Sequence, residues 1–262
     1  KNVGYLDLEG NARIAFGGVF IERLAGGKPA AERRELKSLF SPKSAQILRA
    51  MLREPGRAWR VTELSKASGV SLGHVSNVRT GLIDREWART SGDGVVLSHP
   101  DALLDAWWDS YTAPSGERLR FYTPLHGSAF EEAARSALRS IGGSGHAVFA
   151  SFTAAHWLAS YGRNGTHYFF ADEEGLSKLR AALKLAPVSN GENVSITVPK
   201  DPGLQDDTIE PAPGTVCTSP LQTYLDLSVA GERGTEAAEH LLQERLSWPR
   251  SSTPSMVMGL PA

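Results

Sequence analysis

The sequence predicts an α+β protein built from several segments, and three observations lead to this fold class. The first residues alternate polar and apolar side chains, residues 41–113 show helical patterns that end in a hairpin, and residues beyond 116 alternate strand and helix patterns. A chain of 262 residues is also long enough for two domains. We therefore expect a strand-rich N-terminal segment with a linker (1–40), a helical domain with a hairpin (41–113), a mixed α/β domain (114–248) and a tail (249–262).

The N-terminal segment "GYLDLEGNARIAFGGVFIERL" reads as short strands that turn at "EGN" and "GG". It starts without an initiator Met or a capping residue, so we expect the edge of a larger unit whose beginning precedes Lys1. The following "AGGKPAAERRELKS" is charged and poor in large apolar residues, which is typical of a linker.

The first helix is predicted to begin at Ser41 and Pro42. Serine is a good N-cap, and proline suits the first helical position because its missing N–H costs nothing there. The apolar face of this helix consists of Ile47, Leu48, Met51 and Leu52. "EPGR" then ends the helix, and "AWRV" predicts a short extended piece.

Two further helices and a hairpin follow. Thr62 is expected to cap a two-turn helix that stops at Gly69, and Ser71 is expected to cap the next helix. The inward stripe of that next helix is formed by Val75, Val78 and Leu82. "ARTSGDGVVLSH" predicts a hairpin with glycines at its turn, and "DALLDAWWDSYT" predicts a helix whose two tryptophans pack inward.

This order of elements is typical of a winged helix-turn-helix domain. Gly69 provides the backbone freedom that the turn needs, Val70 fills the core between the helices, and Ser71 starts the next helix. The turn swings the third helix across the second, so that its outer face can enter the major groove of DNA, which admits one helix. We therefore interpret residues 41–113 as a winged helix-turn-helix that binds double-stranded DNA, an arrangement that allows a homodimer on the DNA.

The outer face of the third helix carries short or hydrogen-bonding side chains. Asn77 can pair with adenine and Arg79 with guanine or phosphate, while Ser76 and Thr80 can reach phosphate oxygens. Basic residues on the flanks and on the hairpin are candidates for backbone contacts. The full set of expected DNA-binding residues is Arg57, Arg60, Thr62, Lys66, Ser71, His74, Ser76, Asn77, Arg79, Thr80 and Arg89.

Beyond a boundary expected at residues 114–116, strands and helices alternate as in a mixed α/β domain. The expected strands are 118–123, 146–150, 167–171, 193–198 and 215–218. The expected helices are 127–140, 153–160, 173–184, 219–228 and 233–246, the last one starting from a turn at Arg233–Gly234.

Charge is distributed unevenly along the chain, although the net charge is only −1. Residues 28–60 hold nine Lys/Arg against three Glu, a balance of +6, whereas residues 201–245 hold nine Asp/Glu against two Arg, a balance of −7. This asymmetry predicts one region suited to an anionic partner and another that repels DNA and favours a basic protein surface.

The sequence predicts a cytoplasmic protein without an active site. Cys217 is the single cysteine, and no apolar run approaches the roughly 18 residues that a membrane helix needs. Catalytic and phosphate-binding motifs are missing, and "GGSG" at 142–145 is not followed by the paired carboxylates of a nucleotidyltransferase. Four histidines without metal-ligand spacing are expected on the surface or at strand edges: His126, His146, His156 and His167. We expect neither a cofactor nor a metal.

Residues 219–241, "SPLQTYLDLSVAGERGTEAAEHL", resemble the C-terminal signature of antitoxins from abortive-infection (AbiE-type) type IV toxin–antitoxin systems. "NGENV" at 190–194 and "FTAAHWLA" at 152–159 also look like segments of those proteins, and "YLDLEGNARI" near the start resembles what precedes the winged helix in one branch of the family. The resemblance implies a repressor of its own operon that counters a nucleotidyltransferase-like toxin, with no catalytic residues to carry over. The strand-rich N-terminal region departs from the many relatives that begin with the winged domain.

The signature itself reads as a packing element. Its inward positions are Leu221, Tyr224, Leu225 and Leu227 in one helix and Ala237, Ala238, Leu241 and Leu242 in the next. An alternative is that Tyr224 and Asp226 form a contact site for a partner. Two other functions stay open: a protein-interaction module whose winged helix does not bind DNA, and the partial chain of a nuclease-like enzyme.

Overall fold

The structure of the chain is a computed structural model that describes residues 5–6, 12–16, 19–23, 38–140, 146–162, 164–201 and 203–246. It is a mixed α+β fold, as expected, and the chain divides into two compact units, Lys1–Leu39 and Phe40–Ala262. The boundary expected at residues 114–116 therefore lies inside the second unit. Within the described residues, no helix combines the length and the apolar character needed to cross a membrane.

The first unit contains an antiparallel sheet of three strands, β1 (Tyr5–Leu6), β2 (Ala12–Phe16) and β3 (Val19–Arg23). Tyr5 pairs with Arg13, and Ile14 pairs with Ile21. The strands predicted in this segment are thus confirmed. The two turns, the linker at 25–37, the "GGSG" segment and the tail lie outside the described residues.

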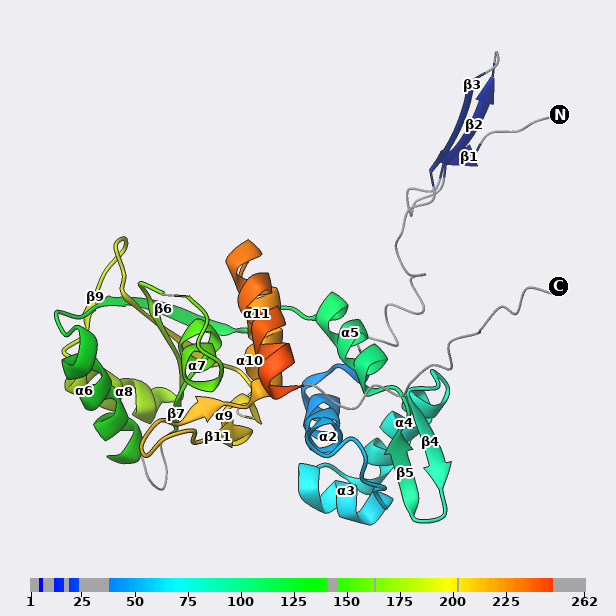
Figure 1. Cartoon of the computed structure of the whole chain (residues 1–262), viewed down its shortest axis with the longest axis horizontal. Helices are drawn as coiled ribbons and strands as arrows, with labels where there is room; N and C mark the ends of the chain where they lie inside the picture. Colours follow the sequence, from blue (N-terminus) through cyan, green and yellow to red (C-terminus); the bar gives the residue numbers. More distant parts are fainter. Residues whose placement is uncertain are drawn as a thin grey trace, which may run out of the picture. The chain divides into compact units, whose positions relative to one another are not determined.

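The second unit begins with three helices, a hairpin and a fourth helix (Figure 1). Their bounds are α2 (Pro42–Arg53), α3 (Val61–Ser68), α4 (Leu72–Ile83), β4 (Ala88–Ser91), β5 (Gly94–Leu97) and α5 (Pro100–Ser110). The predicted apolar stripes of α2 and α4 are buried and form a common core. The hairpin is fastened to this core by a backbone bridge between Trp59 and Val95.

Two details of this helical region differ from the prediction. Thr62 does not cap α3, because the helix starts at Val61 and Thr62 lies inside its first turn. The preceding residue is Arg60, whose backbone N–H donates to Oε2 of Glu63 at 3.3 Å. Trp107 is buried as expected, whereas Trp108 is half-buried with its ring centroid 4.5 Å from that of Tyr224.

The rest of the second unit is built around one sheet with the strand order β11-β12-β7-β8-β10-β6-β9. β8 runs parallel to β10 and β12 runs parallel to β7, while the other neighbours are antiparallel. The strands are β6 (Gly116–Tyr122), β7 (Ala147–Phe149), β8 (His167–Ala171), β9 (Ala186–Pro187), β10 (Val194–Pro199), β11 (Thr208–Ile209) and β12 (Cys217–Thr218). The helices are α6 (Gly127–Ser140), α7 (Ser151–Leu158), α8 (Glu173–Ala182), α9 (Gly203–Asp206), α10 (Pro220–Ser228) and α11 (Glu232–Arg245).

Helices α10 and α11 lie between the sheet and the helical region of this unit (Figure 1). α10 packs against α11, α7 and α5. Its side chains from Leu221 to Leu227 are all buried, so this part of the signature is a packing element, as predicted. The turn predicted at Arg233–Gly234 is wrong, because α11 already starts at Glu232 and follows Gly231, whose φ is +79°. Gly234 instead allows the backbones of α10 and α11 to lie close together, since a Cβ there would clash with the carbonyl of Leu227.

Candidate nucleic-acid interface

The turn between α3 and α4 is held by local contacts. Gly69 ends α3 in the left-handed region with a φ of +67°, which glycine adopts without strain. Val70 is buried, and its carbonyl accepts a hydrogen bond of 2.6 Å from the hydroxyl of Ser65. These contacts fix the direction in which α4 leaves the turn.

Helix α4 has one buried and one exposed face. Val75, Val78 and Leu82 are buried, and the exposed positions are Leu72, Gly73, Ser76, Asn77 and Thr80. The Leu72 side chain is 51% exposed, although it is apolar. The sequence contains no acidic residue between Glu63 and Asp84, so the whole exposed face of α4 is free of negative charge.

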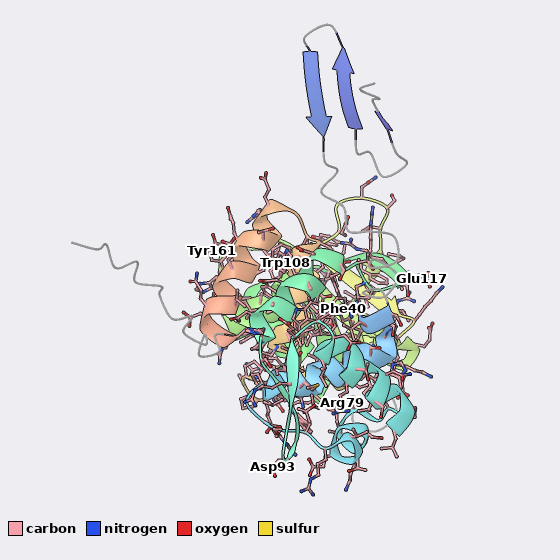
Figure 2. All side chains as sticks on the ribbon, turned by 90° about the vertical axis from the view of Figure 1, so that its right-hand side faces the viewer. Phe40, Arg79, Asp93, Trp108, Glu117 and Tyr161 are labelled. Carbon is pink, nitrogen blue, oxygen red and sulfur yellow. The ribbon has the colours of Figure 1, made fainter. Side chains whose placement is uncertain are left out.

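Most of the predicted DNA-binding residues reach the surface. Nine of the eleven are exposed, namely Arg57, Arg60, Thr62, Lys66, Ser71, Ser76, Asn77, Thr80 and Arg89. Arg79 is half-buried, and its Nη2 donates to the hydroxyl of Thr90 in β4 at 3.1 Å. Figure 2 labels Arg79 and also Asp93 at the tip of the hairpin. Helix α4 and strand β4 are neighbours, as this hydrogen bond and their packing show.

Besides Arg79, three further side chains of this set have contacts within the protein. His74 does not point outward as predicted, because it is half-buried with Nε2 3.0 Å from the hydroxyl of Ser44 in α2. The Arg57 guanidinium lies 3.8 Å from the ring centroid of Trp59. The hydroxyl of Thr80 donates to the carbonyl of Ser76 at 3.1 Å. His74 thus helps to position α4 on α2, and it is a poor candidate for DNA contact.

Leu72 and Gly73 are exposed in the first turn of α4, although they are not among the expected DNA-binding residues. A Cβ at Gly73 would meet no atom within 4 Å, so neither packing nor a positive φ requires glycine there. The sequence could have indicated their exposure, because Leu72 and Gly73 start the helix and precede its inward stripe, which begins at Val75. A position without a side chain lets another molecule approach the backbone closely.

Comparisons of the chain with protein-family models, with curated proteins and with solved structures found no match.

The histidines of the α/β part are not equivalent. His126, His146 and His156 are exposed, and His146 pairs with Asp172 through Nδ1 at 3.4 Å. His167 is the first residue of β8, which agrees with the strand-edge position expected for it, and its half-buried ring lies with its centroid 3.7 Å from that of Phe130. Burial lowers the pKa of His167 to about 4, and it is uncharged at neutral pH. No group of three or more His, Cys, Asp or Glu in the described part of the chain could hold a metal ion.

A buried polar cluster joins the helical region to the α/β part. Nη2 of Arg49 in α2 donates to Oε1 of Gln222 in α10 at 2.6 Å, and its Nε lies 3.9 Å from Oδ2 of Asp207. Asp207 also accepts hydrogen bonds from Arg53 and, at 2.6 Å, from the hydroxyl of Ser219. The buried charge of Arg49 in the helical region is therefore balanced by the carboxylate of Asp207 in the α/β part.

The same cluster contains a second carboxyl group, that of Asp226. Its Oδ1 accepts from the hydroxyl of Tyr111 at 2.6 Å and from Nε2 of Gln222 at 2.8 Å. Burial raises the pKa of Asp226 to about 7, while the two hydrogen bonds and Arg49 oppose this rise. Asp226 and Tyr224 thus make contacts inside the molecule, which argues against the alternative that they form a surface for a partner.

Proposed function

We propose that residues 41–113 form a winged helix-turn-helix and that the protein is a sequence-specific, double-stranded-DNA-binding transcriptional regulator that acts in the cytoplasm. The observation that carries this proposal is the exposed face of α4. It carries Ser76, Asn77 and Thr80, is free of acidic residues and lies next to β4, which carries Arg89, and this suits a helix that lies in a major groove.

The proposal gives each exposed residue a chemical role. Asn77 offers an amide that pairs with adenine, and Leu72 offers an apolar contact for a thymine methyl group. Arg60, Lys66 and Arg89 supply sequence-independent contacts to phosphates. The N-terminal N–H groups of α4, beside Gly73, favour a phosphate through the helix dipole.

We expect Asn77→Ala and Arg79→Ala to weaken specific binding by about 1–3 kcal/mol each, because each removes a group that can read a base edge. Lys66→Ala should instead weaken binding to all sequences alike and flatten its dependence on salt. The measurement is a gel-shift titration of the full chain on the promoter of its own gene and on a scrambled duplex, at several salt concentrations.

Lys178→Ala is the matched control, because Lys178 lies on α8 in the α/β part and pairs with Glu174. It should bind the promoter like the unchanged chain. If all three test variants bind both duplexes with the same affinity as the unchanged chain, the proposal is contradicted and a protein-interaction module is favoured.

We further propose that the regulator represses a type IV toxin–antitoxin operon and counters its nucleotidyltransferase-like toxin. This part rests on the resemblance of residues 219–241 to AbiE-type antitoxins and on the exposed acidic side chains of α11, Glu232, Glu236, Glu239 and Glu244. These carboxylates favour a partner with a basic surface.

The antitoxin role predicts that co-expression of the full chain restores growth to cells that express the neighbouring toxin gene. A chain with Asn77→Ala and Arg79→Ala should restore growth equally well if neutralisation does not require DNA. If the cells do not grow although the unchanged chain is folded and abundant, the antitoxin role is contradicted and only the role as a transcriptional regulator remains.

A further inference from the structure

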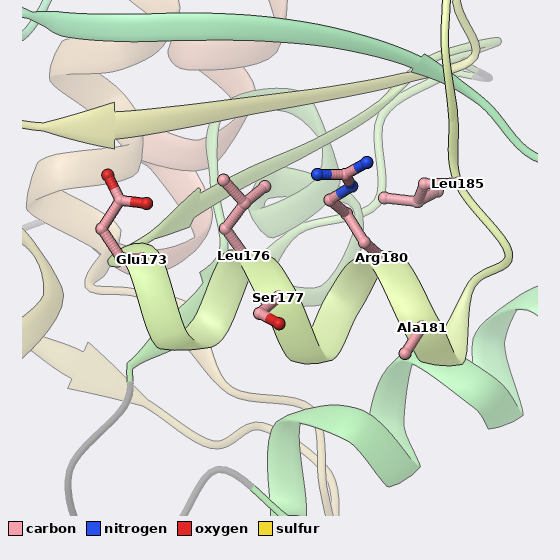
Figure 3. A pocket seen from close by; sticks show the side chains of 6 residues that line it. All are labelled: Glu173, Leu176, Ser177, Arg180, Ala181 and Leu185. Atoms are coloured by element: carbon pink, nitrogen blue, oxygen red, sulfur yellow. The ribbon is translucent and has the colours of Figure 1, made fainter.

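The α/β part holds a pocket of about 1310 Å³ between α6, α7, the start of β8 and the first turns of α11. Pockets for drug-sized ligands usually measure roughly 300–1,000 Å³, so a ligand with several rings would fit. A second pocket of about 470 Å³ runs along α8, where Glu173, Leu176 and Arg180 point to the same side (Figure 3). In that second pocket the Arg180 guanidinium already lies 5.7 Å from the ring centroid of Phe121.

The walls of the larger pocket are rich in aromatic rings. Its lining includes Phe130, Phe149, Phe152, Trp157, Tyr161 and Tyr168. The rings are held in place by one another, with centroid distances of 6.3 Å between Phe149 and Trp157 and 5.9 Å between Phe152 and Tyr168. Phe130 and Phe149 are buried, so the rings that remain partly exposed are those of Phe152, Trp157, Tyr161 and Tyr168. Flat faces in fixed positions favour a ligand that is itself flat, because stacking depends on ring geometry.

Two of these rings already attract cations from the protein. The guanidinium of Arg135 lies 5.9 Å from the ring centroid of Trp157, and that of Arg118 lies 6.0 Å from that of Tyr168. The negative face of an aromatic ring attracts a cation in this way, and the attraction increases when water is excluded. Neither arginine lines the pocket, and each lies over one ring, so the preference for a cation has to come from the remaining ring faces and from the lining carboxylates.

The charged residues of the lining also favour a cation. Among the described lining residues, Glu131, Glu232 and Glu236 are acidic, and Arg233 is the one lysine or arginine. Glu236 is also close to the aromatic wall, because the hydroxyl of Tyr161 donates to its Oε2 at 3.3 Å. His167 adds no positive charge near pH 7, since burial keeps its imidazole neutral.

From these observations we infer that the pocket binds a small organic cation with a flat ring system. The rings would stack on the ligand and attract its charge, and the carboxylates of α11 at the rim would balance that charge. Neither step uses the face of α4, so the inference does not depend on DNA binding.

The test is an equilibrium titration of the full chain, without DNA, by calorimetry with three probes. Proflavine is a flat cation, acridine-9-carboxylate is a flat anion of similar size, and tetraethylammonium is a cation without a ring. We expect proflavine to bind with a stoichiometry of one and both other probes to bind at least about tenfold more weakly, as the ring-face attraction for a desolvated cation implies.

Two variants at exposed positions test the lining without endangering the fold. The double variant Glu232→Gln and Glu236→Gln should bind proflavine about fivefold more weakly, because it loses two rim charges. Tyr161→Leu, at a side chain that is 46% exposed, should weaken binding by a similar factor through the loss of one ring.

Glu244→Gln is the matched control, since Glu244 is exposed on α11 but does not line the pocket, and it should leave proflavine binding unchanged. Equal binding of the acridine anion and cation would overturn the inference, as would unchanged proflavine binding in both test variants or no binding of any probe.

Discussion

Asp207→Asn is expected to lower the free energy of unfolding by about 3 kcal/mol, because it leaves the buried Arg49 cation without its nearest carboxylate. Asparagine has nearly the same shape but only one side-chain oxygen, so it can accept from Arg53 while its amide NH₂ group donates to the hydroxyl of Ser219. The change therefore removes the charge together with one acceptor. The measurement is urea denaturation of the full chain at pH 8, followed by tryptophan fluorescence and by circular dichroism.

A second change separates charge from packing. Adding Arg49→Met to Asp207→Asn should recover most of the lost stability, since replacing both charges by uncharged groups removes the unpaired ion. If the double variant is instead less stable by the sum of the two single effects, the ion pair is not the reason for the loss.

Asp226→Asn serves as the matched comparison in the same cluster. The folded chain holds the Asp226 proton more tightly than the unfolded chain, so this carboxyl contributes stability that is lost as the pH rises from about 4 to about 7. Asparagine at this position should remove that part of the pH dependence and cost far less at pH 8 than Asp207→Asn, because Oδ1 can still accept both of its hydrogen bonds.

Local patterns in the sequence predict much of this fold correctly. The stripe of Val75, Val78 and Leu82 repeats every three or four residues, and α4 buries those residues. The predicted strand at 167–171 and the predicted helix starting at residue 173 agree with β8 and α8. Predictions of this kind are correct because a few neighbouring residues determine each helix or strand. The two-residue strands β9 and β11 were not predicted, since their extended backbone depends on pairing with β6 and β12.

Contacts between distant residues could not be predicted in the same way. Arg49 and Gln222 are 173 residues apart, and the basic stretch that contains Arg49 looks like an exposed surface when only its composition is considered. His167 has a strand pattern that does not show whether Phe130 will cover its ring. For the candidate interface, the sequence identifies the exposed polar positions of α4, but the contact between His74 and Ser44 depends on how α4 packs on α2.

The buried signature helix changes how the antitoxin resemblance should be tested. Because α10 connects α11 and α7 with α5, substitutions in residues 220–228 would disturb packing before they affected any partner. A contact with a toxin has to be sought on exposed residues, and the acidic side chains of α11 are the first to examine. Loss of function after a change in α10 would therefore say little about a binding surface.

If α4 binds DNA as proposed, Gly73→Glu is expected to leave the chain folded and to weaken specific DNA binding strongly. A side chain at Gly73 meets no atom within 4 Å, and both the replacement of a helical glycine and an acidic residue in the first turn favour the helix. The same carboxylate would face the DNA phosphates, where a like charge costs about 3 kcal/mol, a loss of roughly 100-fold in affinity. Thermal unfolding and a gel-shift titration on the promoter measure the two effects on the same sample.

Three substitutions at this one position distinguish charge from size. Gly73→Gln has the shape of the glutamate without its charge, so it should bind DNA more tightly than Gly73→Glu and more weakly than the unchanged chain. Gly73→Arg should strengthen binding to the promoter and to a scrambled duplex together and steepen the dependence on salt, because it adds a phosphate contact without reading a base. If all three variants are as stable as the unchanged chain and bind the promoter as tightly, the first turn of α4 does not face DNA, and the proposed orientation of this helix is wrong.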